Sequence, residues 1–572
     1  MTLTDTFKKI GASKFSQFIP KLLICLKEGY TKKLFMNDLF AGITVGIITL
    51  PPAFAFAIGA GVTPERGLFT AIVAGFLISL FGGSRVQISG PTGAFVVIIY
   101  DIVQRNGYEG LAIATILAAF ILIILGITKC GSLIRYIPYP VVTGFTTGIA
   151  TAIFTSQIKD FCGLQIAKPA AEFTHKMAQY WQFSNTFNLT AFLLAAFTLA
   201  IIASIRRINR KIPGTIIAVM MATIVSYFFD LGIPTIESKF GAIPSSIPAP
   251  TFPVFSLDKI ISLFPDAITI ALLGAIESLL SAVVSDGMTG YRHNSNVELI
   301  GQGIGNLGSI IFGGIPATGA IARTTANVQM HAKTPISGMI HAVTLFVIMA
   351  LFAPIAGKIP LAALAAVLVF VAYNMSEFHH FVEILKGPKS CALVLLLTFA
   401  LTVLVDLTVA VQVGVLIGVF FFLKHMSDKT TIKAINLSLE EQNEIYPDES
   451  ANSAQLDIPK DVAVFEINGP FFFGVSDLLN DALRLHPTTP KVFILRLRHV
   501  PLIDSSGIQA IKNFHQKCQK LGIQFLITEV RPDVFETMKR SSLQKTLGKE
   551  SFFKALEIAL HKANDTLAAS PS

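Results

Sequence analysis

Between Asn37 and Leu423 the chain is a succession of apolar runs separated by short polar turns. Most runs hold about 17–25 residues, the length at which a helix crosses ~30 Å of hydrocarbon. Clear candidate spans are Leu39–Ala60, Leu68–Phe81, Leu111–Ile127, Val141–Ser156, Leu189–Ile205, Ile216–Phe229, Ile260–Val284, Ile340–Phe352, Leu361–Ala372, Cys391–Val405 and Val409–Leu423. Shorter or Gly-rich candidates are Ser89–Val103, Leu299–Phe312 and Thr318–His331. Together the runs predict an all-α polytopic membrane domain with about fourteen spans.

Two of the short segments carry the same sequence pattern. Phe81–Gly83 is followed by Gly90–Ala94 (Gly-Pro-Thr-Gly-Ala), and Phe312–Gly314 is followed by Pro316–Ala320 (Pro-Ala-Thr-Gly-Ala). Each copy is predicted to open an apolar helix. The segments fall near the third and tenth spans, which are equivalent positions in two halves of seven. Because seven is odd, the second half must be inverted relative to the first. Paired Gly/Pro-interrupted segments of this kind point to the midplane site of a transporter.

A helix that begins part-way across the membrane has a distinctive chemistry at its start. Its first backbone N–H groups lack intrahelical partners and carry about half a positive charge, so the start attracts anions. The alternative is that Pro and Gly only kink two packed helices. On the first interpretation the candidate anion-binding residues of the two half-helices are Thr92, Gly93, Ala94, Thr318, Gly319 and Ala320.

Ionisable side chains near these segments add to the candidate site. Glu277 lies in the apolar run Phe264–Val284, where a carboxylate costs about 2–3 kcal/mol. It could take up a proton or help to bind a cation, or it could anchor a structural hydrogen bond. Ser281 follows one turn later on the same face and is either part of the coupling-ion site or a small packing residue. Arg323 supplies positive charge to the anion site, or forms a salt bridge with Glu277 or Asp286.

Composition agrees with a membrane protein. The chain has 572 residues, of which 52% are hydrophobic and only 14% charged, against roughly 25% charged in soluble domains. The net charge of +9 reflects topology rather than a nucleic-acid partner, because lysines precede the first span and basic residues at 206–211 separate two later ones. Positive loops and an even span count predict cytoplasmic N- and C-termini. The five cysteines show neither pairing nor metal-ligand spacing. Since no residue cluster supports covalent catalysis or a metal centre either, no cofactor, metal or enzymatic activity is expected.

The C-terminal part has the pattern of a small soluble α/β domain. The expected division is a cytoplasmic segment 1–36, a transmembrane domain 37–424, a linker 425–460 and the α/β domain 461–572. Predicted strands are Val462–Ile467, Val492–Leu497 and Gln524–Thr528, and predicted helices are Ser476–Leu485, Ser506–Lys520 and Pro532–Lys539. Asp504 or Ser505 is the natural N-cap of the second helix. A phosphate on this turn would meet a favourable helix dipole, which makes Asp504 and Ser505 a candidate regulatory site for a cytoplasmic partner.

From about Lys33 to His561 the chain resembles a bacterial member of the sulfate permease (SulP) family with a C-terminal STAS domain. The most specific stretches are Ile276–Asn296, Gly313–Asn327 and Asp504–Gly507. The resemblance implies a seven-plus-seven inverted repeat in the bacterial cytoplasmic membrane, divided into a core and a gate domain. It also implies a substrate site between the third and tenth spans, a homodimer, and transport by an elevator-like movement of the core.

The resemblance extends to individual residues. Glu277 matches the eighth-span carboxylate that is associated with proton or cation coupling. Sodium-coupled bicarbonate relatives have aspartate and a following threonine there, so Glu277 with Ser281 favours protons. The segment Thr318–Thr324 matches the anion-facing half-helix, with Ala322 where several animal members have serine. Pro51 and Pro52 replace a family Pro-Gln pair whose glutamine reaches the substrate, so the anion is not identified. The Asp504–Gly507 turn is phosphorylated in soluble STAS proteins but is often only structural in membrane-attached ones.

The leading hypothesis is therefore a secondary active transporter of a small oxyanion (sulfate, bicarbonate or a C4-dicarboxylate) in symport with protons. Sodium-coupled bicarbonate symport is one alternative. A channel-like or exchanging chloride pathway is another, although such a pathway gains nothing from a buried carboxylate at Glu277. A membrane-anchored sensor would need far fewer spans, and a nucleobase transporter would not need Arg323.

Overall fold

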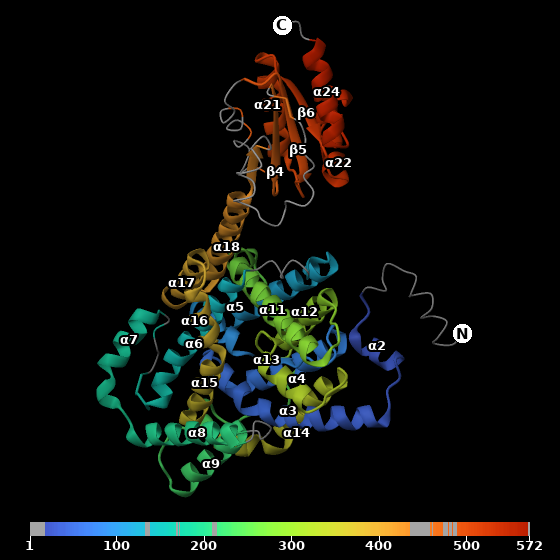
Figure 1. Ribbon diagram of the computed structural model, residues 1–572. Helices are drawn as coiled ribbons and strands as arrows, with labels where there is room; N and C mark the ends of the chain where they lie inside the picture. The colour runs from blue at the N-terminus through green and yellow to red at the C-terminus, as the bar shows by residue number, and fades with distance from the viewer. Residues whose placement is uncertain are drawn as a thin grey trace. The chain divides into compact units, whose positions relative to one another are not determined.

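A computed structural model shows the chain as two compact units, Met1–Gly418 and Val419–Ser572 (Figure 1). The first unit is helical and the second is built on a β-sheet. The structure describes residues 18–131, 138–166, 170, 172–208, 214–405, 407–434, 458–459, 461–472, 479, 483 and 489–569.

The first unit consists of helices and two very short strands. Its helices are α2 (Lys21–Lys27), α3 (Lys32–Gly59), α4 (Pro64–Phe81), α5 (Gly93–Ile127), α6 (Tyr139–Phe161), α7 (Phe173–Gln182), α8 (Leu189–Ile208), α9 (Gly214–Phe228), α10 (Ile236–Phe240), α11 (Leu257–Thr289), α12 (Ser295–Ile311), α13 (Ile321–Gln329), α14 (Ile336–Gly357), α15 (Leu361–Met375), α16 (Phe378–Lys386) and α17 (Lys389–Leu404). Helix α18 (Leu407–Lys429) continues from this unit into the second. The strands are β1 (Ser89–Gly90) and β2 (Thr318–Gly319).

Eight helical stretches in the described part of the chain are long and apolar enough to cross a membrane. Helices α9 and α17 are apolar but shorter. Two predicted spans, Ser89–Val103 and Leu111–Ile127, fall largely within the single 35-residue helix α5. Gly107 interrupts that helix with φ 66°, a backbone conformation that glycine adopts at least cost. The total of about fourteen spans stays a prediction, because length and apolarity alone do not identify half-helices.

Equivalent helices of the two predicted halves make equivalent packing contacts. Helix α3 packs against α14, and correspondingly α11 packs against α5. Helix α4 also packs against α14, as α12 does against α5. Between the halves, α4 packs on α12 and α6 on α15. Exchanging the first half for the second therefore reproduces the main contacts, as an internal repeat requires.

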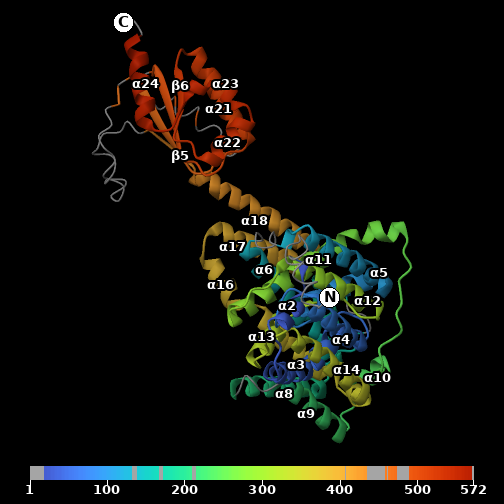
Figure 2. The ribbon, with the colours of Figure 1, turned by 90° about the vertical axis from the view of Figure 1, so that its right-hand side faces the viewer.

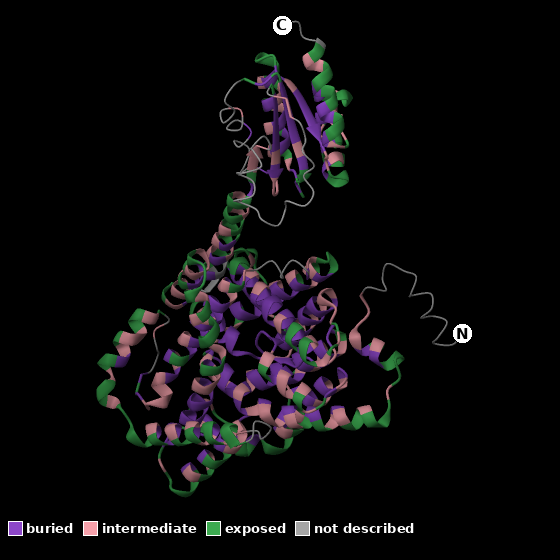
Figure 3. Ribbon diagram, viewed as in Figure 1, coloured by how far each residue is buried: buried purple, intermediate pink, exposed green. Residues whose placement is uncertain are grey.

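Burial is highest where these helices meet (Figure 3). The most apolar 18-residue window of α11 is 72% buried inside the protein, whereas those of α8 and α14 are 28% and 33% buried. Since α11 is enclosed by other helices, its polar side chains face protein rather than lipid. Glu277 of α11 is one of them.

The second unit is a five-stranded sheet with helices on both faces (Figure 2). Its strand order is β3 (Thr431–Ala434), β4 (Val462–Asn468), β5 (Val492–His499), β6 (Gln524–Thr528) and β7 (Phe552–Phe553), and β3 alone is antiparallel to its neighbour. Helices α21 (Ser505–Lys520), α22 (Pro532–Arg540) and α23 (Leu543–Leu547) share a core with one face, and α24 (Leu556–Ala569) packs on the other. Alternate residues of β5 serve the two cores: Phe493 faces α21, and Ile494 faces α24.

Most sequence predictions for this unit are confirmed. The three predicted strands are present, as are the helices predicted at Ser506–Lys520 and Pro532–Lys539. The helix predicted at Ser476–Leu485 lies almost entirely outside the described residues. Strand β3 lies within the segment 425–460 that was expected to be a linker, and pairs with β4 at the sheet edge. With four residues it is too short to show a periodic pattern.

Candidate functional site

The two Gly/Pro-interrupted segments lie side by side in the first unit. Strands β1 and β2 pair antiparallel, with Ser89 opposite Gly319 and Gly90 opposite Thr318. The backbone N–H of Ala320 also donates to the Ile88 carbonyl at 2.9 Å. Because α5 begins shortly after β1 and α13 shortly after β2, this pairing brings both helix starts to one place. The structure thus brings together Thr92, Gly93 and Ala94 with Thr318, Gly319, Ala320, Ala322 and Arg323.

The two Thr-Gly-Ala stretches are not structurally equivalent. In the first half the helix begins at Gly93, and the Thr92 hydroxyl caps it by accepting from the Ala94 N–H at 3.0 Å. In the second half Thr318 and Gly319 form a strand, and α13 begins at Ile321 with Ala320 as N-cap. The pattern is therefore followed by a helix in both copies, as predicted, but in the second copy the helix begins two residues later relative to Thr-Gly-Ala. The Thr318 hydroxyl donates instead to the Gly274 carbonyl of α11 at 2.8 Å.

The start of α5 faces apolar side chains of three other helices. A Cβ on Gly93 would lie 2.8 Å from the sulfur of Met375, 3.2 Å from Ile153 and 3.4 Å from Phe56. These residues belong to α15, α6 and α3. Glycine at this position therefore lets these three side chains pack directly against the start of α5.

Arg323 places a full positive charge between the two helix starts. Its side chain is buried, and one terminal nitrogen donates to the Pro91 carbonyl, two residues before α5 begins. The other terminal nitrogen lies 2.8 Å from the position that a Cβ on Gly90 would occupy, and no described atom accepts a hydrogen bond from it. Neither Glu277 nor Asp286 forms a salt bridge with Arg323 in the described part of the chain. A buried guanidinium with an unused donor is a ready partner for an anion.

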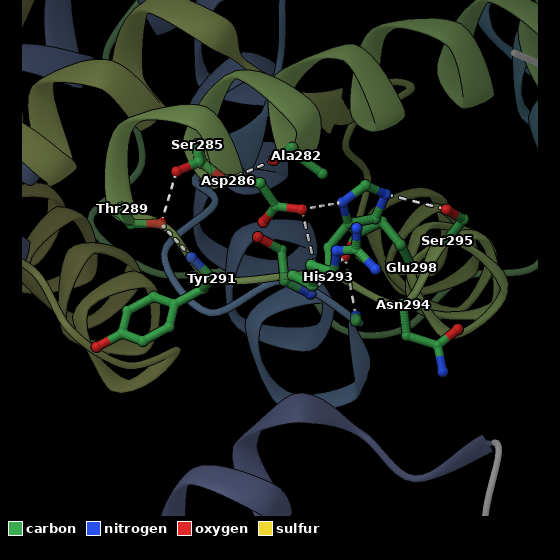
Figure 4. A network of polar contacts seen from close by, with 12 residues as sticks. Ala282, Ser285, Asp286, Thr289, Tyr291, His293, Asn294, Ser295 and Glu298 are labelled. Atoms are coloured by element: carbon green, nitrogen blue, oxygen red, sulfur yellow. Dashed lines mark hydrogen bonds and ion pairs between the residues drawn. The ribbon is translucent and has the colours of Figure 1, made fainter.

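Asp286 has a different partner, which Figure 4 shows. Its carboxylate accepts from the His293 backbone N–H at 2.9 Å and lies 2.6 Å from the same residue's Nδ1. The other ring nitrogen of His293 lies 3.0 Å from the Ser295 hydroxyl. These contacts fix the turn between α11 and α12, in agreement with the position of Asp286 at the end of its predicted span.

Glu277 lies directly behind the paired strands. The next residue, Ser278, has its Cα 3.1 Å from where a Cβ on Gly319 would lie, and Gly274, one turn earlier, accepts the Thr318 hydroxyl. The Glu277 side chain is only 8% exposed. It makes no hydrogen bond or ion pair with another residue that the structure describes. A structural anchor would have such a partner, because burying an unpaired carboxylate is costly. The side chain is thus available to a coupling ion.

Ser281 connects α11 to both broken segments. Its hydroxyl donates to Thr324 Oγ1 at 2.9 Å, and that oxygen also accepts from the Ile88 N–H at 3.0 Å. Ser281 is completely buried. Both interpretations of Ser281 remain compatible with this contact. The residue is packed between helices, and its hydroxyl oxygen still has a lone pair that could bind a coupling ion.

Sequence reasoning missed the side chains of α12 that hold the broken segments in place. Glu298 accepts from the Gly83 N–H at 2.9 Å, and Gln302 donates to Glu298 at 2.9 Å. Asn306 binds both backbone groups of Ala317, accepting at 2.8 Å and donating at 2.9 Å. The signal was available in the sequence: Glu298, Gln302 and Asn306 recur every four residues and form one polar stripe on a helix.

Asp38 of α3 was also missed, although it is a fully buried carboxylate. It accepts from the Lys333 N–H at 2.7 Å, from the Thr334 N–H at 3.1 Å and from the Thr334 hydroxyl at 2.6 Å. The Tyr30 hydroxyl donates to it as well. The carboxylate therefore caps the approach to α14 and ties it to α3.

We expect Asp38→Asn to destabilise the membrane unit. The amide keeps one oxygen for the Lys333 and Thr334 N–H groups, but it replaces the oxygen that accepts from the Thr334 and Tyr30 hydroxyls with a donor. These buried hydroxyl hydrogen bonds are lost or reversed, at a cost of about 1–3 kcal/mol. The change should appear as a lower midpoint of thermal unfolding in detergent. Asp258→Asn, at an exposed position in the first turn of α11, is the matched control and should leave the midpoint unchanged. An unchanged midpoint for Asp38→Asn would contradict the capping role.

In the second unit, Asp504 is the N-cap of α21. Its carboxylate accepts from the Gly507 N–H at 2.8 Å, and Ser505, the first helical residue, is exposed. Of the two N-cap candidates, the structure therefore selects Asp504. Phosphorylation at this turn stays a prediction.

Comparison with known proteins identifies the family of this chain. The sulfate permease family matches residues 35–398, and the STAS domain matches residues 453–559. The chain belongs to the sulfate permease family. A putative sulfate transporter YvdB of Bacillus subtilis is 40% identical over 528 residues, covering 92% of this chain and 97% of the relative. A bicarbonate transporter BicA of a Picosynechococcus species is 32% identical, covering 77% of this chain and 79% of the relative.

A solved structure extends the likeness to the fold of the whole chain. The murine anion transporter Slc26a9 matches with a TM-score of 0.85 over 98% of both chains, at 18% identity. This sulfate permease family member is accordingly a multi-pass membrane protein that transports anions, with a C-terminal STAS domain. It is not an enzyme, since its family and relatives are transporters.

Proposed function

We propose that this protein is a secondary active transporter that carries a small oxyanion (sulfate, bicarbonate or a C4-dicarboxylate) in symport with protons. One observation carries the proposal: the antiparallel β1–β2 pair brings the starts of α5 and α13 together beside the Arg323 guanidinium. Two helix starts and one guanidinium form an environment in which a small anion is strongly favoured over a neutral molecule or a cation.

The anion would bind in front of Gly93. The start of α5 carries the partial positive charge of a helix N-terminus, and the Arg323 nitrogen without a described acceptor lies beside Gly90, three residues earlier. The surrounding side chains, Phe56, Ile153 and Met375, are apolar, so water competes weakly for these donors. An oxyanion suits the site because its several oxygens accept several donors at once.

Glu277 would couple the anion to a proton. Its turn of α11 packs on β2, so the carboxylate and the anion would occupy one region of the unit. The carboxylate has no partner among the described residues, and Glu377 at the start of α16 interacts with it unfavourably. Proton uptake removes a negative charge that would otherwise repel the anion, which links the two binding events.

Sodium-coupled bicarbonate symport is the second candidate. It is favoured by the similarity to bicarbonate transporters and by the hydroxyl pair of Ser281 and Thr324, whose oxygens lie between α11 and α13. Hard cations such as sodium prefer oxygen ligands of this kind. We prefer proton coupling over sodium coupling because a single carboxylate without a partner is enough to bind a proton.

An elevator-type movement fits the distribution of hydrogen bonds. Bonds from Thr318 to Gly274, from Ser281 to Thr324 and from Asn306 to Ala317 join the broken segments, α11 and α12 into one body. Towards α6 and α15, by contrast, the start of α5 offers apolar contacts. Apolar surfaces slide past each other without breaking hydrogen bonds. The proposal also includes a homodimer in the bacterial cytoplasmic membrane, with both termini in the cytoplasm and a regulator that acts on the STAS turn.

Uptake into proteoliposomes tests the proposal. Labelled sulfate, bicarbonate and fumarate are each offered with an inward proton gradient and then with an inward sodium gradient. We expect one oxyanion to accumulate under the proton gradient, because protonation of Glu277 favours anion binding. Accumulation driven only by sodium would select the second candidate. Chloride conductance without gradient-driven uptake would contradict both.

A further inference from the structure

A separate cavity of about 380 Å³ leads along α5 towards the proposed anion site. It is bounded by the end of α3, by α5, α6, α7 and α10, and by the end of α17. On α5 it extends from Val96 to Gln104. Val96 lies three residues after Gly93, so the inner end of the cavity is about one helical turn from the start of α5.

Three carboxylates and three lysines are among the described residues that line this cavity: Asp101, Asp160 and Glu172, and Lys159, Lys176 and Lys239. Asp101 lies 2.7 Å from Arg105, Asp160 lies 3.6 Å from Lys239, and Glu172 lies 3.1 Å from the ring of His175. Two further lining residues, Lys159 and Lys176, have no carboxylate within 4 Å in the part of the chain that the structure describes. These two ammonium groups therefore have hydrogen-bond donors to offer an anion.

Helix α7 also offers a hydrogen-bond donor. Lys176 lies with its ammonium 5.5 Å from the centre of the Tyr100 ring, which holds it towards α5. Tyr180 follows four residues later on the same helix face and is only 7% exposed. Its hydroxyl is buried, and no described residue is its hydrogen-bond partner. A buried hydroxyl without a partner is costly, and a bound acceptor would remove that cost.

We propose that this cavity is a vestibule that binds a small oxyanion through Lys159, Lys176 and Tyr180 and delivers it along α5 to the site in front of Gly93. The ammonium groups of the two lysines attract the anion, and the Tyr180 hydroxyl donates to one of its oxygens. Helix α5 then connects the cavity to the site in front of Gly93. The vestibule rests on the proposed function only for the identity of its occupant, an oxyanion. Its three binding residues lie on α6 and α7, whereas Arg323 and Glu277 of the inner site lie on α13 and α11, so the two sites can be tested separately.

Transport kinetics form the first test. Lys176→Gln should raise KM for the transported oxyanion roughly tenfold, because it removes local attraction, and should leave kcat within about twofold. Tyr180→Phe should raise KM less and should not lower the unfolding midpoint, since the hydroxyl it removes has no partner in the described residues. Lys358→Gln is the matched control, because Lys358 pairs with Glu237 at the end of α14 and lies outside the vestibule. An unchanged KM for Lys176→Gln would overturn the vestibule.

The second test, protection of Lys176 from acetylation by a bound anion, does not require transport. The full-length protein is treated with acetic anhydride at constant ionic strength, with sulfate or with a bulky organic anion as the counter-ion, and acetylation of Lys176 is followed by mass spectrometry. We expect sulfate to slow acetylation of Lys176 but not of Lys358, both in the wild type and in Arg323→Gln. Protection without uptake would support the vestibule and count against the proposed transport. Equal acetylation with both anions would overturn the vestibule whatever the uptake.

Discussion

Glu277→Gln is expected to abolish accumulation of the anion against its gradient while leaving anion binding and exchange at least partly intact. Glutamine has the shape of glutamate but does not gain or lose a proton. A gradient of one pH unit supplies about 1.4 kcal/mol per proton and supports roughly tenfold accumulation. In the variant the internal concentration should therefore stop at the external one. Proteoliposome uptake at several imposed pH gradients measures this ratio.

Comparing anion accumulation with thermal stability distinguishes a coupling role of Glu277 from a structural one. The Glu277 side chain makes no hydrogen bond with the described residues, so its replacement by glutamine should not lower the unfolding midpoint. Glu65→Gln, at the first turn of α4, provides a control within the same unit and should accumulate the anion like the wild type. The coupling role would be refuted by a Glu277→Gln protein that still accumulates anion with the wild-type dependence on the pH gradient.

The repeated Gly/Pro pattern allowed the meeting of two half-helices to be predicted, but not its register. Helix α13 begins later than the pattern indicates because Thr318 and Gly319 are held by distant residues. The Thr318 hydroxyl binds α11, and a Cβ on Gly319 would lie only 1.7 Å from the Gln87 side chain. Contacts between residues so far apart in sequence leave no trace in local periodicity.

Length also explains why the span count could not be settled from the pattern. Helix α13 has nine residues and extends for only about 14 Å, less than half of the hydrocarbon core. Conversely, α5 with its bend at Gly107 contains two predicted spans. An apolar run thus predicts burial in the membrane better than it predicts a complete crossing.

The vestibule was invisible in the sequence for a related reason. Lys176 and Tyr180 belong to a polar segment between two apolar runs, where charged residues are usually solvated. Their contacts with Tyr100 of α5 and with the shared cavity arise only from the packing of α7 against the end of α6 and α17. The polar stripe of α12, by contrast, has a helical spacing that sequence reasoning could have used.

Arg323→Gln is expected to weaken binding of the transported anion roughly 30-fold or more, since removing one partner of a buried charge pair costs about 2–5 kcal/mol. The glutamine side chain is two bonds shorter, so the change removes the charge, the unused donor and the contact with the Pro91 carbonyl. Arg323→Lys should lose less affinity for the anion, because lysine keeps the positive charge and lacks only the planar guanidinium with its several donors. Equilibrium binding of labelled anion to purified protein measures both variants.

Thermal stability separates loss of the anion from loss of the fold at Arg323. In the absence of anion the buried guanidinium has a donor without a described partner, so Arg323→Gln should unfold at the same temperature as the wild type or at a higher one. Added anion should stabilise the wild type in proportion to RT ln(1 + [anion]/Kd) and should scarcely affect the variant. Because a misfolded variant would instead unfold early with and without anion, the two explanations give opposite shifts. An Arg323→Gln protein that gains the full wild-type stabilisation from the anion would remove Arg323 from the site.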